Sequence, residues 1–183
     1  YSVMNPYYIL ENHLNEYESE RFYGKFQVDY DFLKYFKFTY RLGFDTSTGQ
    51  RHTGVPNYAA LFPNTPNYAD ELSTETGSTS QQITRRREIN HDAFVTFDMP
   101  VEDFNVNVIA GFNGNERSYK SLYSGVTNLT IPTFYNITNS AEIPSTEESQ
   151  WKRRLVGIYG QAEVAWKNQL YRTLTARNDG AST

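Results

Sequence analysis

Six stretches of the chain alternate apolar and polar residues with period two, and very short and very long connections join them in turn. Side chains on a β-strand point alternately to opposite faces, so each stretch divides into an apolar row and a polar row. Each stretch has roughly the ten residues that a tilted strand needs to cross the hydrocarbon layer of a membrane. The predicted strands are residues 21–32, 35–45, 90–99, 104–113, 155–166 and 170–179.

The apolar row consists of the odd-numbered residues of the strand 90–99 and the even-numbered residues of the other strands. In the first strand it holds Phe22, Phe26 and Val28, whereas Lys25 and Gln27 belong to the polar row. A soluble antiparallel sheet with one face on a core produces the same alternation. The connections favour a membrane wall instead, because aromatic residues gather beside the short turns, as in the interfacial girdles of membrane barrels.

Short turns are predicted at 33–34, 100–103 and 167–169, and long loops at 46–85 and 114–150. In outer-membrane barrels the tight turns are periplasmic and the long loops extracellular. The sequence therefore predicts an all-β fold, an antiparallel transmembrane β-barrel portion of about six strands. Since the smallest membrane barrels have about eight strands, the whole chain is expected to be part of a larger barrel. Its edge strands are then expected to pair with further strands of that barrel.

The composition of the sequence gives no support to several classes of protein, such as helical membrane proteins, nucleic-acid-binding proteins and enzymes. No run of about eighteen apolar residues exists, so no helical membrane span is expected. Cysteine is absent, which excludes disulfides and thiolate metal sites. A net charge of -4 gives no reason to expect a nucleic-acid partner. Neither a phosphate-binding glycine loop nor a zinc-binding motif occurs, so neither an enzyme nor a cofactor is expected.

The segment GIYGQAEVAWKNQLYRTLTARND, residues 157–179, resembles the barrel hairpin of TonB-dependent outer-membrane transporters of the SusC/RagA type from Bacteroidetes. Asn5, Pro6 and Tyr7, followed by RFYGKFQVDYDFLKYFKFTYRLGFD, and PTFYNITN at 132–139 resemble the same family. The resemblance implies a barrel of about twenty-two strands with an internal plug domain. It also implies a TonB-contacting segment and a SusD-like surface lipoprotein that captures glycans or peptides. The chain is expected to hold a middle portion of the barrel, without plug or TonB-contacting segment.

Two residues near the end depart from the family pattern. Arg172 stands where the family usually has an apolar residue, and Gly180 where a tryptophan is expected. Arg172 lies on the apolar row with Leu170 and Leu174. A cation there is predicted to destabilise the barrel unless it reaches an interface or another chain.

Aromatic residues in the predicted long loops are the candidate ligand contacts. Aromatic rings among amide and hydroxyl side chains suit the binding of sugars or peptides. The same residues also suit packing against neighbouring loops or a lid. The candidates are Tyr58, Tyr68, Tyr123 and Tyr135.

Two basic clusters stand at the outer ends of strands that run inward. They are residues 85–87 and 152–154. Because alternate residues of a strand point to opposite faces, Arg85, Arg87, Lys152 and Arg154 fall on the apolar row. They are candidates for contact with lipopolysaccharide phosphates, since guanidinium and ammonium groups pair well with phosphate. Ordinary solvated charges, or cations that snorkel at an interface, are the alternative.

These patterns predict one component of an outer-membrane nutrient importer that takes up oligosaccharides or peptides. Its expected partners are a SusD-like lipoprotein, TonB, the remaining barrel strands and plug, and the lipids of a Gram-negative outer membrane. A soluble β-sandwich carbohydrate-binding module of the lectin type is one alternative. A passive porin is the other.

Overall fold

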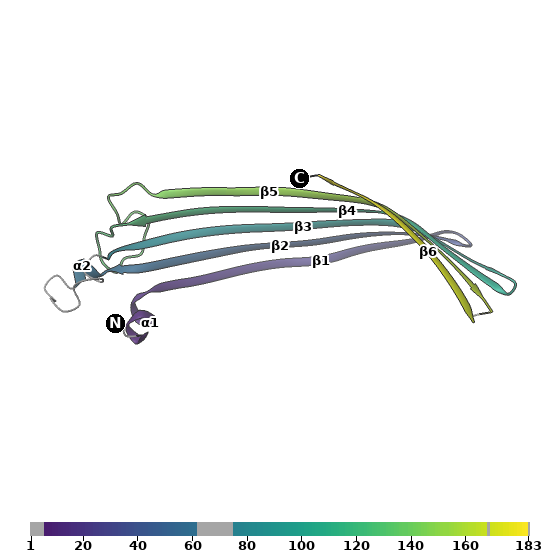
Figure 1. Ribbon diagram of the computed structural model, residues 1–183, viewed down its shortest axis with the longest axis horizontal. Helices are drawn as coiled ribbons and strands as arrows, with labels where there is room; N and C mark the ends of the chain where they lie inside the picture. Colours follow the sequence, from purple (N-terminus) through teal and green to yellow (C-terminus); the bar gives the residue numbers. More distant parts are fainter. Residues whose placement is uncertain (1–5, 62–74, 168, 183) are drawn as a thin grey trace. The chain divides into compact units, whose positions relative to one another are not determined.

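The computed structural model describes residues 6–61, 75–167 and 169–182, which form one antiparallel sheet in the order β1-β2-β3-β4-β5-β6 (Figure 1). Two short helices, α1 (Pro6–Asn12) and α2 (Tyr58–Leu61), accompany the sheet. None of the helices in this part of the chain has the length and hydropathy to cross a membrane. The strands are β1 (Leu14–Leu33), β2 (Phe36–Asn57), β3 (Thr76–Val101), β4 (Phe104–Thr127), β5 (Ser145–Trp166) and β6 (Leu170–Ser182).

All six predicted strands and their three tight turns are present. The predicted extent of the loops 46–85 and 114–150 is wrong, because β2, β3, β4 and β5 continue far into them. These continuations lack an apolar row; β3, for example, begins with TGSTSQQ. Backbone pairing extends a sheet without any alternation of side chains, so periodicity gave no sign of it. The connections that remain, 58–75 and 128–144, are still much longer than the turns.

The chain divides into two compact units, and β1 to β5 each contribute residues to both. We call them after the connections that they contain. The turn-end unit consists of Arg21–Ser47, Arg86–Tyr119 and Trp151–Thr183. The loop-end unit consists of Tyr1–Glu20, Thr48–Arg85 and Lys120–Gln150.

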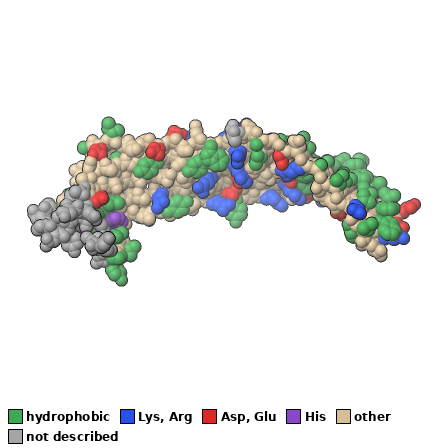
Figure 2. Space-filling view, in the orientation of Figure 1, with side chains coloured by type: hydrophobic (Ala, Val, Ile, Leu, Met, Phe, Trp, Pro, Cys, Tyr) green, Lys and Arg blue, Asp and Glu red, His purple; other side chains and the backbone are tan. Residues whose placement is uncertain are grey.

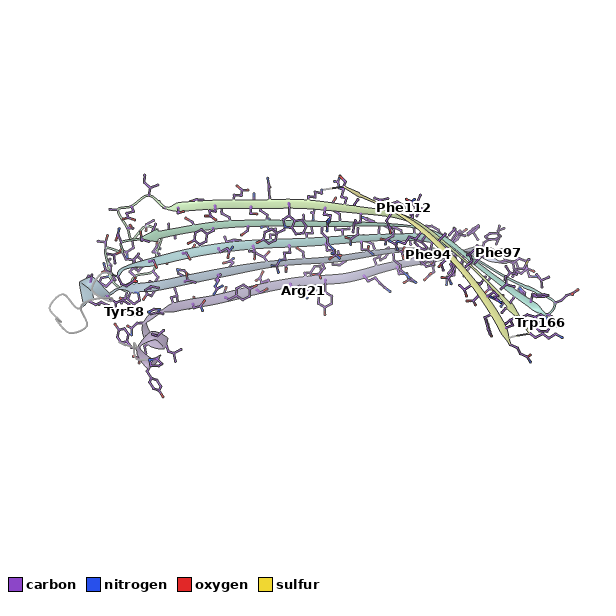
Figure 3. All side chains as sticks on the ribbon, in the orientation of Figure 1. Arg21, Tyr58, Phe94, Phe97, Phe112 and Trp166 are labelled. Carbon is purple, nitrogen blue, oxygen red and sulfur yellow. The ribbon has the colours of Figure 1, made fainter. Side chains whose placement is uncertain are left out.

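The turn-end unit has the predicted apolar row on one face of the sheet. The rings of Phe22 and Phe44 lie 5.3 Å apart across β1 and β2, and those of Phe36 and Phe97 lie 4.8 Å apart across β2 and β3. Hydrophobic side chains gather near the tight turns on the face seen in Figure 2, and Figure 3 labels Phe97 and Trp166 there. Most large side chains of the row are exposed, and Leu174 reaches 75%.

The buried core lies almost entirely in the loop-end unit. Among the described residues the buried hydrophobic side chains there are Tyr58, Val126 and Leu129, and Leu129 is only 1% exposed. The turn-end unit contributes Ala165 alone to this set. Among the described residues, no second layer covers the apolar side chains of the turn-end unit.

Candidate functional site

The two long connections are joined at their base by Asn57, the last residue of β2. Its backbone amide donates to the carbonyl oxygen of Pro132 over 2.9 Å, and its side-chain amide donates to the carbonyl of Leu129 over 2.7 Å. Its side-chain oxygen accepts from the Ala60 amide over 3.0 Å and so caps α2. Gly77 passes next to Asn57 with φ of 76°, and a Cβ there would lie 2.7 Å from the Asn57 nitrogen. Only glycine fits this approach of two backbones.

The connection between β4 and β5 is organised by the side chain of Asn139. This amide is almost fully buried, and its nitrogen donates to the carbonyls of Ile131, over 2.8 Å, and Phe134, over 2.6 Å. Its oxygen accepts from the Ile131 amide over 2.9 Å. A buried amide that satisfies three backbone groups holds a turn firmly. The PTFYNITN segment is therefore a folded connection.

Tyr58, a predicted ligand contact, is a core residue of the loop-end unit. It is 3% exposed, and its hydroxyl lies 2.7 Å from the Nε2 atom of His13. Its ring packs against the ring of Tyr8, with centroids 5.9 Å apart. Burial raises the pKa of Tyr58 to about 12, so its hydroxyl stays protonated at neutral pH. The side chain anchors α1 and α2 to the sheet and presents little surface to a ligand.

Tyr135 ties the second connection to the end of α1. Its hydroxyl donates to the backbone carbonyl of Asn12, and its ring lies over Gly54 on β2. A Cβ at Gly54 would overlap this ring. Burial also raises the pKa of the Tyr135 hydroxyl. Tyr135 is half-buried, so part of its surface remains open.

The structure brings together two of the four predicted tyrosines, Tyr58 and Tyr135, which both contact the end of α1. Tyr123 lies on β4, and its hydroxyl lies next to Gly125. Tyr68 lies outside the described residues. A ligand role for these tyrosines stays a prediction.

Exposed apolar side chains are the open surface of this region. Tyr7 and Leu10 on α1 are each 79% exposed, and Ile143 in the second connection is 93% exposed. Ile131 and Phe134 of that connection are exposed as well. Sequence reasoning marked Phe134 as an aromatic loop residue but missed Leu10, Ile131 and Ile143, because single apolar residues in polar segments carry no periodic pattern.

The polar row of the turn-end unit carries a hydrogen-bonded network centred on Arg41. The Nε atom of Arg41 donates to Gln27 over 3.2 Å, and Nη1 lies 3.9 Å from the Asp92 carboxylate. Tyr159 on β5 donates to the same carboxylate over 2.9 Å. The network thus links β1, β2, β3 and β5 on one face. Gln27 also donates to Asp29, which accepts from Thr39 over 2.6 Å.

Three of the four basic residues predicted on the apolar row, Arg87, Lys152 and Arg154, surround a carboxylate that sequence reasoning missed. Glu116 on β4 lies 2.9 Å from Lys152, 2.7 Å from Arg154 and 3.5 Å from Arg87. Lys152 and Arg154 lower the pKa of Glu116 to about 2, so it stays ionised. The alternation of the strand could have revealed Glu116, since this residue continues the apolar row of β4 beyond Phe112.

Arg86 and Arg153 lie between these basic residues in the sequence and belong to the opposite face of the sheet. Arg86 lies over the ring of Tyr119, with its guanidinium carbon 5.7 Å from the centroid. Tyr119 in turn stacks on Trp151 of β5, with centroids 5.9 Å apart. This stack belongs to the polar row. Arg153 also belongs to the polar row by parity, since it lies between Lys152 and Arg154 on β5.

No protein-family model matches the sequence, and no curated protein matches it. Solved structures of a peptide transporter do. One structure of the RagAB peptide transporter matches over 96% of this chain at 12% identity, with a TM-score of 0.80. The RagAB peptide importer in the "closed-closed" state matches over 98% at 13% identity, with a TM-score of 0.79, and in the "open-open" state over 99% at 14% identity, with a TM-score of 0.76. This chain spans 19% of the length of each matched chain. It therefore shares the fold of the matched portion of the RagAB transporter chains.

Proposed function

We propose that the chain forms part of the wall and outer mouth of a TonB-dependent outer-membrane importer that takes up peptides or oligosaccharides with a SusD-like surface lipoprotein. In this importer the apolar row faces lipid, the polar row faces the lumen, and the long connections are extracellular. The plug, the TonB-contacting segment and the remaining strands belong to other parts of the whole protein.

One observation carries the proposal: the apolar row of the turn-end unit is exposed on a single-layer sheet. Phe22, Phe26, Ile158 and Leu174 all leave more than half of their surface uncovered. Soluble proteins rarely expose a continuous apolar surface of this kind. A β-sandwich would cover it with a second sheet, whereas a membrane barrel leaves it to lipid. The similarity in fold to the RagAB chains supports the membrane barrel rather than the β-sandwich.

The network around Arg41 supports a lumen-facing polar row. Charged and amide side chains that satisfy one another tolerate a wet interior, and they fix the orientation of side chains across neighbouring strands. Because Gln27, Arg41 and Asp92 lie on one face and Phe22 and Phe44 on the other, the two environments are separated by the thickness of one sheet.

The exposed apolar residues of the loop-end unit support a protein partner at the mouth. A lid that covers Leu10, Phe134 and Ile143 would be stabilised by their burial, because burial of apolar surface contributes about 25 cal/mol per Å². The RagAB structures are of a peptide transporter, and peptides are one of the two substrate classes proposed here.

The membrane wall is tested with spin labels at position 26 and position 27 of the intact transporter in lipid. We expect the label at Phe26 to be accessible to a lipid-soluble quencher and the label at Gln27 to a water-soluble one. The neighbouring positions serve as controls for each other. Equal accessibility would contradict the barrel assignment.

The lid is tested by the double substitution Leu10→Glu and Ile143→Glu in the intact transporter. We expect the lipoprotein to co-purify less and substrate uptake to fall, while the barrel still assembles. Leu122→Glu is the matched control, because Leu122 is an exposed apolar residue on β4 rather than in a connection. Normal co-purification and normal uptake would leave these connections without a role in capture.

A further inference from the structure

We propose that Arg87, Lys152 and Arg154, gathered around Glu116, form a binding site for the phosphate groups of anionic outer-leaflet lipids. The inference rests on the proposed function, because it needs the apolar row to face a membrane. It deepens that function by naming a lipid class and the residues that hold it. We call these four residues the phosphate cluster.

The charge of the cluster is the first argument. Three cations share one carboxylate, which leaves a net charge of +2 at neutral pH. The cations stay 47% to 60% exposed while Glu116 is 24% exposed, so the basic groups lie outermost. Cations that converge on one point repel each other, and Glu116 holds them together before any ligand binds. A further anion can therefore bind without rearranging the cluster.

The position of the cluster is the second argument. Trp166 belongs to the aromatic residues at the tight turns, and Arg154 precedes it on β5 by 166 - 154 = 12 residues. Twelve residues of strand span about 40 Å. With a tilt of about 40°, this is about 30 Å along the membrane normal, against an apolar band of about 25 Å. The cluster thus lies just past the outer edge of the band.

The phosphate cluster also lies on the same face of the sheet as the apolar row, which is the third argument. Arg154 lies two residues from Val156, and Glu116 lies four residues from Phe112, all on the apolar row. A ligand on the phosphate cluster therefore has acyl-chain surface directly beside it. Phosphate offers several strong acceptor oxygens to Arg and Lys, and a lipid phosphate sits at this depth with its chains along the apolar row.

The test uses the intact transporter in nanodiscs of phosphatidylcholine that contain either bis-phosphorylated lipid A or dephosphorylated lipid A. Native mass spectrometry measures the lipid A retained per barrel. We expect wild type to retain the phosphorylated form selectively. The triple variant R87Q/K152Q/R154Q should retain it at least about tenfold less, since each lost contact is charge-assisted.

The double variant R86Q/R153Q is the matched control, because it removes two arginines of the same β3 and β5 segments from the opposite face. It should retain lipid A as wild type does. If the triple variant does not assemble, Arg154→Gln alone should still lower retention severalfold. An additional arm supplies inorganic phosphate in plain phosphatidylcholine discs.

Equal retention by wild type and the triple variant would overturn the inference, as would equal retention of dephosphorylated lipid A. Binding of inorganic phosphate with no preference for lipid A would overturn it too, since the ligand would then be a free ion. A wild-type transporter that imports substrate but shows no lipid A preference contradicts this inference alone. A transporter that does not insert into any bilayer contradicts the proposed function as well.

Discussion

The turn-end and loop-end units are built from the same strands, yet they are stabilised in opposite ways. The turn-end unit exposes its apolar row and, among its described hydrophobic residues, buries Ala165 alone, whereas the loop-end unit buries Tyr58, Val126 and Leu129. In the first unit the surroundings must supply the apolar environment. In the second the connections fold back and supply a small core themselves. The difference indicates that one strand can belong to an apolar-faced sheet in one part and to a polar, self-packed region in another, provided that its side chains change.

The packing of the connections stabilises the loop-end unit, although its strands lack an apolar row. Asn57 joins the two connections by backbone and side-chain hydrogen bonds, and Tyr135 ties the second to α1. These bonds give the loop-end unit contacts within the chain that the turn-end unit lacks among its described residues. Substitutions should therefore have effects that depend on the unit and the face.

The largest effect is expected for Leu129→Ala in the loop-end unit. Leu129 is 1% exposed, and truncating such a leucine costs about 2 to 5 kcal/mol because a cavity remains. Hydrogen exchange of the connection 128–144 in the intact barrel measures the loss. Ile131→Ala, at an exposed position of the same connection, should change protection little. Equal effects at both positions would mean that this unit has no core of its own.

Leu174→Arg should be nearly as costly in the turn-end unit, but only on one face. Leu174 pairs with Ala162, four residues from Trp166 (166 - 162 = 4), which is about 10 Å inside the band. An arginine at that depth costs about 2 to 4 kcal/mol on a lipid-facing row. The urea midpoint of the barrel in lipid is the measurement. Thr175→Arg, on the polar row, should leave the midpoint nearly unchanged, and a similar loss at both positions would refute the two-faced wall.

Arg172→Leu should give a smaller gain. The register pairs Arg172 with Val164, two residues from Trp166, so the cation lies only about 5 Å inside the band and reaches the interface. The expected gain in stability in lipid is at most about 1 kcal/mol. A rise in the urea midpoint as large as the loss caused by Leu174→Arg would place Arg172 at mid-membrane instead.

The smallest effect concerns Glu116 and pH. Its pKa falls from 4.5 to about 2 because Lys152 and Arg154 pair with it. A lowered pKa stabilises the folded state above pH 4.5, and this contribution disappears as the pH falls towards 2. Glu116→Gln should therefore lower the urea midpoint at pH 6 and match wild type near pH 2. A difference that persists unchanged at low pH would exclude this ion cluster as its cause.

The sequence predicted the turn-end unit well because only there do the two faces of a strand meet different surroundings. Alternation then gives strands, turns and faces together, and it also placed Arg87 and Lys152 on one row. The loop-end strands could not be predicted, since segments such as TGSTSQQ are held by backbone pairing.

The candidate site was predicted less well than the wall. Residue type marked Tyr58 and Tyr135 as aromatic loop residues, but their burial depends on α1 and on contacts between distant segments. Glu116 was missed for a simpler reason. A single acid at the end of an apolar row becomes meaningful only when neighbouring strands bring cations to it. Gly180 departs from the family pattern at an open position, where a Cβ would meet only the Val156 carbonyl at 3.9 Å.

The side chain of Asn139 has a consequence for how fast a partner can dock. Because it fixes the carbonyls of Ile131 and Phe134 from within, the connection holds its shape before anything arrives. A partner that lands on Phe134 or Ile131 meets a preorganised surface and does not bear the entropy of ordering a loose loop. Docking at this connection is therefore expected to proceed as a rigid-body encounter, at a rate set by diffusion and orientation rather than by folding of the loop.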